Sequence, residues 1–97
     1  MRAVVALGGN AIIKKGEKET YSNLVNNIKK SCSYLIPIIR KYDIVLTFGN
    51  GPEIGFLALQ NEIARKYVPQ MPLDILGAES QGLIGYPLEE QLINELN

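Results

Sequence analysis

Two glycine turns hold the residues of this chain that are best suited to chemistry. The first turn is Gly8-Gly9-Asn10, and the second turn is Gly49-Asn50-Gly51; each follows a short apolar run. A strand that ends in glycines and opens a helix can hold an anionic oxygen, because the backbone comes close and the helix start presents unpaired N–H groups. Two adjacent turns of this kind would hold two anionic groups side by side, which is the arrangement that phosphoryl transfer requires.

The spacing of the glycines leaves a second interpretation open, in which they only reverse the chain. Neither turn matches G-x-G-x-x-G or G-x-x-x-x-G-K-[ST], the patterns of dinucleotide and P-loop sites. The position of the turns favours a site, because both follow predicted parallel strands, and open α/β sheets bind ligands at the carboxyl ends of their strands. The amides of Asn10 and Asn50 would hydrogen-bond either a ligand or the local backbone.

The composition excludes several classes of function. The 97 residues are enough for one small domain, and they include no histidine and a single cysteine, Cys32. A histidine-based catalytic triad, a zinc site and an internal disulfide are therefore excluded. A net charge of zero gives no bulk attraction to nucleic acid or to an anionic membrane, and the apolar runs are too short to cross a bilayer. With no secretory signal in the sequence, we expect a cytoplasmic location.

The elements that would position the turns form a βαβ unit. The apolar, β-branched segment 2–7 predicts a buried strand, segment 43–48 predicts a second strand, and segment 21–41 predicts a helix between them. Strands connected in this way run parallel. Pro37 predicts a kink or an early stop in the helix. The helix carries an apolar stripe at steps of three and four residues, made of Leu24, Ile28, Cys32, Leu35 and Ile39.

Two more helices are predicted, over 52–67 and 75–96, with Asp74 as a candidate N-cap of the second. The first of them would turn Ile54, Leu57, Ala58 and Ala64 inward. The second carries a stripe of small residues, Ala78, Gly82 and Gly85, which favours close packing against another backbone. The polar segment 11–20 predicts a surface loop, whose Lys14 and Lys15 either neutralise a phosphate or remain in solvent.

Three segments resemble those of the carbamate kinases, a branch of the amino acid kinase family. They are 4–11 (VVALGGNA), 47–55 (TFGNGPEIG) and 72–86 (PLDILGAESQGLIGY), and they agree with the family in order and spacing. The third favours carbamate kinases over kinases of acetylglutamate, aspartate, glutamate or uridylate. The resemblance implies an α/β fold of the amino acid kinase type, a three-layer α/β/α sandwich of which this chain supplies an incomplete parallel βαβ portion.

The resemblance also implies an activity, reversible phosphoryl transfer between ATP and carbamate that gives ADP and carbamoyl phosphate. It implies ATP/ADP with Mg²⁺, a role in arginine metabolism and a homodimer for the full-length protein. By the family pattern, Gly8, Gly9 and Asn10 lie beside the transferring phosphate, and Gly49, Asn50 and Gly51 bind carbamate or the transferred group through backbone amides. No catalytic side chain and no metal ligand is assigned in this portion.

Three residues depart from the family pattern: Phe48 replaces a common histidine, Glu53 replaces a glutamine, and Pro87 falls where an uninterrupted helix is expected. The nucleotide-binding half of the family, with its phosphate-facing lysines, comes later in the chain. We therefore expect residues 1–97 to be an N-terminal, substrate-side segment of the domain that is inactive alone. The alternative is a non-catalytic remnant that binds phosphate or carboxylate, or that pairs with another protein through an exposed strand edge.

Overall fold

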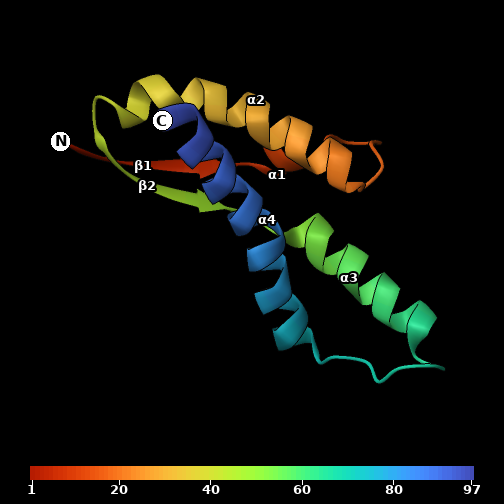
Figure 1. Cartoon of the computed structure of the whole chain (residues 1–97). Coiled ribbons are helices and arrows are strands. Elements are labelled where there is room, and N and C mark those ends of the chain that lie inside the picture. Colours follow the sequence, from red (N-terminus) through yellow and green to blue (C-terminus); the bar gives the residue numbers. More distant parts are fainter.

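Two parallel strands and the helices that follow them make up the fold in a computed structural model that describes residues 1–97. The elements are β1 (Arg2–Leu7), α1 (Gly9–Ile12), α2 (Tyr21–Ile39), β2 (Asp43–Phe48), α3 (Gly51–Ala64) and α4 (Leu73–Leu96). In Figure 1, α2 and the C-terminal part of α4 lie beside the sheet, while α3 and the start of α4 reach away from it. The molecule is therefore elongated, with extents of 51 × 24 × 23 Å.

The sheet confirms the predicted βαβ unit and the bounds of both strands. β1 and β2 are parallel and in register, from Arg2 opposite Asp43 to Leu7 opposite Phe48. Because the two six-residue strands end opposite each other, the glycine turns that follow them leave the same edge of the sheet.

Only one face of the sheet is covered. Exposed and half-buried residues alternate along both strands, and Val4 and Val45 on the open face are 72% and 56% exposed. Leu46 and Phe48 on the other face pack against the buried core. The expectation of a buried strand over 2–7 was therefore wrong for one face, because the helices cover only the other face. The core consists of Ile12, Ile13, Leu24, Ile28, Cys32, Ile84 and Leu88.

Helix α2 buries the predicted stripe as far as Leu35, and Ile39 is half-buried. The helix begins after Thr20, whose hydroxyl accepts a hydrogen bond from the Asn23 N–H at 3.1 Å. It continues through Pro37 and ends two residues later, so the proline lies in the last turn. Cys32 is a core residue, and burial, with a smaller effect from Glu95, raises the pKa of its thiol to about 11.

The start of α4 differs from the expected one. Pro72 occupies the N-cap position, so Asp74 lies inside the first turn and does not cap the helix. Its carboxylate there still complements the partial positive charge of the helix start. The stripe of small residues packs loosely within this chain, since a Cβ on Gly82 would meet nothing within 4 Å and one on Gly85 only the Phe48 ring at 3.6 Å.

Helix α3 contacts little beyond α4. The four residues expected to face inward, Ile54, Leu57, Ala58 and Ala64, are only half-buried, and the one buried side chain of the helix is Glu53. Ile63 and Leu59 are 70% and 58% exposed. The inward-facing assignment was therefore wrong in degree, because α3 extends away from the sheet (Figure 1).

Truncation of the core is expected to be costly at Ile28, which is fully buried on α2. The Ile28→Ala variant should lose about 2–5 kcal/mol of unfolding free energy, since it leaves a cavity between α2 and α4. Urea denaturation followed by circular dichroism measures the loss. The matched control is Ile63→Ala, at a position that is 70% exposed. If Ile63→Ala lost as much unfolding free energy as Ile28→Ala, the assignment of Ile28 to the core would be contradicted.

Candidate anion-binding site

The two predicted glycine turns lie next to each other at one edge of the sheet. The pairing of Leu7 with Phe48 makes Gly8 and Gly49 the next residues on neighbouring strands. The second turn opens α3, a helix of 14 residues whose N-cap, Asn50, makes no side-chain hydrogen bond to the helix start. The N–H groups of Gly51 and Glu53 in the first turn of α3 are therefore not occupied by this cap, and Pro52 between them has no N–H.

Open space lies over the glycines of both turns. A Cβ added at Gly8, Gly9, Gly49 or Gly51 would meet no heavy atom within 4 Å. None of these four residues has a positive φ; only Gly16 does, at 82°. The missing side chains therefore leave the backbone accessible to a ligand, and the turns store no backbone strain.

The side chain of Asn50 is held by α4. Its Nδ2 donates to the Ser80 Oγ at 2.6 Å, and that hydroxyl donates to the Gly77 carbonyl at 2.6 Å. Ser80 is fully buried. The amide of Asn50 thus fixes the second turn against α4, whereas Asn10 is exposed at the start of α1.

Ser80 was missed as a positioning residue, although the sequence contains a signal for it. It lies four residues after Leu76 and four before Ile84, both of which are buried. A hydroxyl on a buried helix stripe needs a hydrogen-bond partner, and here it finds one 30 positions away in the sequence.

A basic loop is fixed beside the first turn. Lys14 and Lys15 line a hollow of about 360 Å³ together with Gly9, Asn10 and Pro52. The Glu17 carboxylate accepts hydrogen bonds from Asn27 Nδ2 at 2.7 Å and from the Lys14 N–H at 3.1 Å. Both hydrogen bonds lower the pKa of Glu17, and the one from Asn27 has the larger effect. The same Asn27 amide donates to the Ile12 carbonyl at 2.9 Å, so it holds the loop that carries both lysines.

Glu53 is an unusual residue for the start of α3. It is 4% exposed, and neither of its carboxylate oxygens has a hydrogen-bond partner. Burial is the main cause that raises the pKa of Glu53, and the Glu19 carboxylate raises it further. Burial therefore makes the charged form of Glu53 less favourable beside the glycine turns than it would be in solvent.

Carbamate kinases match the chain over nearly its whole length. The carbamate kinase of Rhizobium meliloti is 51% identical over 96 residues, which are 99% of this chain and 29% of that protein. The carbamate kinase of Pyrococcus horikoshii is 42% identical over 98 residues, covering 98% of this chain and 31% of that protein. No family model matches the chain.

Solved structures agree with these relatives. A carbamate kinase from Giardia lamblia bound to AMP-PNP superposes with a TM-score of 0.92 at 41% identity, over 96% of this chain and 33% of that one. The chain thus spans about a third of the length of the curated relatives and solved structures that it matches.

The parallel strands, the covering helices and the superposition define an incomplete α/β fold of the amino acid kinase type, as the sequence predicts. Within that fold the chain is similar to carbamate kinases, which confirms the predicted resemblance. None of its helices combines the length and the hydropathy that a membrane span requires.

The raised pKa of Glu53 predicts a pH dependence of stability. The folded chain holds the Glu53 proton more tightly than the unfolded chain does. The contribution of Glu53 to the unfolding free energy is therefore largest below the ordinary pKa of a glutamate and declines as the pH rises toward the raised value.

The Glu53→Gln variant should remove this decline and gain stability relative to the original chain as the pH rises. Melting temperatures measured from about pH 4 to pH 8 test this expectation, because the range spans the ordinary carboxyl pKa. The control is Glu90→Gln, on an exposed position of α4. If the melting temperatures of Glu53→Gln and of the original chain changed with pH in parallel, the prediction of a raised Glu53 pKa would be contradicted.

Proposed function

We propose that residues 1–97 form the N-terminal, substrate-side segment of a carbamate kinase domain. The full-length parent would transfer a phosphoryl group reversibly between ATP and carbamate, giving ADP and carbamoyl phosphate. The observation that supports this proposal most is that the two parallel strands end opposite each other, so that both glycine turns lie together. The similarity to carbamate kinases supports the choice of substrates.

Each turn has its own role in this proposal. Gly8, Gly9 and Asn10 lie beside the transferring phosphate, and the backbone amides of the second turn hold carbamate or the transferred group. The partial positive charge at the start of α3 favours an anion there, and amides fixed by the fold need no reorganisation during the reaction. Asn50, through its bond to Ser80, keeps the second turn in place.

The chemistry of the reaction suits a site built from backbone groups. Phosphoryl transfer depends on positioning and on charge stabilisation more than on covalent help. The carbamate oxygen is anionic before the reaction starts, so it needs no general base, and a chain without histidine is adequate. Lys14 and Lys15 line the hollow beside the first turn together with Glu17 and Glu19, so any attraction of an anionic substrate would come from the two lysines locally and not from a net charge of the hollow.

The nucleotide and its magnesium ion would be held mainly outside these residues. Residues 1–97 contain no group of three or more Asp, Glu, His or Cys side chains placed to hold a metal ion. They do not fit a magnesium site of their own, and no step is assigned to the metal in this segment. The Giardia relative bound to AMP-PNP supports ATP/ADP as the parent's nucleotide.

The further properties proposed for the parent follow from the same similarity. They are a homodimeric state, a cytoplasmic location and a role in arginine metabolism, while the 97-residue segment is inactive alone. The alternative is a non-catalytic remnant that binds phosphate or carboxylate, or that pairs with another protein. The unpaired outer edges of the two-stranded sheet favour pairing of this kind.

The glycine turns can be tested in the parent enzyme with Gly9→Val and Gly51→Val. Each variant should lower the rate of ATP formation from ADP and carbamoyl phosphate by roughly 10²-fold or more, because the side chain blocks backbone hydrogen bonds to the reacting group. The fold should be retained, since a Cβ at either position meets no atom within 4 Å.

The control is Lys30→Ala, on an exposed position of α2 outside both turns. Near-normal turnover in Gly9→Val or Gly51→Val would contradict the role assigned to that turn.

The 97-residue chain distinguishes the two proposals: a cooperative monomer whose melting temperature rises with phosphate supports the remnant, whereas aggregation supports the segment of a larger domain.

A further inference from the structure

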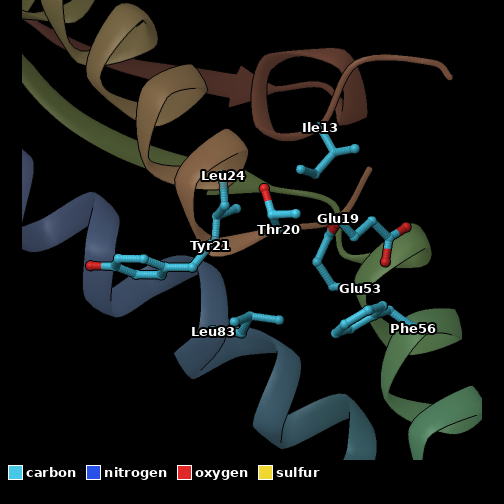
Figure 2. A pocket seen from close by; sticks show the side chains of 8 residues that line it. All are labelled: Ile13, Glu19, Thr20, Tyr21, Leu24, Glu53, Phe56 and Leu83. Carbon is cyan, nitrogen blue, oxygen red and sulfur yellow. The ribbon is translucent and has the colours of Figure 1, made fainter. Parts of the chain in front are cut away.

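A cavity of about 190 Å³ lies between the loop before α2, the start of α3 and the middle of α4. Figure 2 shows its side chains, which come from three helices and the loop. It contains none of the six residues assigned to the anion-binding site. It is lined by Ile13, Glu19, Thr20, Tyr21, Leu24, Glu53, Phe56 and Leu83.

The cavity has a carboxylate that the fold leaves without a partner. Glu53 is only 4% exposed, and neither of its two carboxylate oxygens has a hydrogen-bond partner. A second carboxyl group, that of Glu19, also belongs to the wall, and none of the eight lining residues is basic. Buried polar groups in folded proteins are normally paired, so the unpartnered oxygens of Glu53 can accept hydrogen bonds from a bound donor.

The rest of the wall selects the kind of cation. Leu24, Phe56 and Leu83 give the cavity an apolar surface, whereas the ring of Tyr21 points away from it. A hydrated metal ion would lose water ligands that such a wall does not replace. An organic cation fits better, because its alkyl body packs on the apolar side chains.

We propose that this cavity binds a small organic cation of the primary alkylammonium class. The ammonium group donates to the Glu53 carboxylate, and the alkyl body lies against Phe56 and Leu83. Hydrogen bonds between two charged groups are stronger than neutral ones, and the buried position removes competition from water. The proposal depends on the cavity and not on the glycine turns, so its failure would leave the proposed phosphoryl transfer untouched.

Titration of the full-length parent with butylammonium chloride tests the proposal by calorimetry near pH 7.5. We expect saturable binding and a rise in melting temperature, neither of which potassium chloride or butanol should produce. The Glu53→Gln variant keeps the shape of the side chain but not its charge, and should bind at least about tenfold more weakly. Glu90→Gln, on the exposed face of α4, should bind as the original chain does.

A second measurement needs no variant. The affinity of the original chain for butylammonium should fall as the pH is lowered and the Glu53 carboxylate takes up a proton. Three outcomes would overturn the proposal: no saturable heat with the original chain, equal affinity in Glu53→Gln, or an affinity that does not change with pH.

Discussion

The in-register parallel pairing of β1 with β2 determines where the other functional parts of the chain lie. Residues on alternate positions of a strand face opposite sides, so a slip of one residue would turn Leu46 and Phe48 away from the core. The same slip would move one glycine turn along the sheet relative to the other. The apolar contacts that fix the register thus also fix the distance between the two turns.

The start of α3 combines two opposing electrostatic requirements. Its free N–H groups and partial positive charge favour an anion, while Glu53 places a carboxyl group in the same turn. Burial shifts that carboxyl toward its neutral form, which leaves the charge of the helix start available to a ligand. A cation on the Glu53 side would have the same effect, because it too cancels the negative charge next to the turn.

Local patterns predicted the parts of the fold that depend on local physics. The bounds 2–7 and 43–48 are those of the observed strands, because β-branched runs stopped by glycine leave little freedom in where a strand ends. The stripe on α2 was also predicted locally, from apolar residues at steps of three and four. Other features of the fold depend on contacts between residues far apart in the sequence, such as the hydrogen bond between Asn50 and Ser80. No local pattern specifies which faces of the sheet and of the helices other elements cover. The open face at Val4 and the burial of Glu53 are of that kind.

The last helix completes a core that the first third of the chain begins. Ile84 and Leu88 of α4 are buried with residues of α2 and of the segment that follows β1. During synthesis, residues 2–48 leave the ribosome with both strands and α2 but without these two side chains. Until α4 has been synthesised, the nascent chain lacks two of the seven buried residues of this core, so Ile28 and its neighbours do not yet have their full cover.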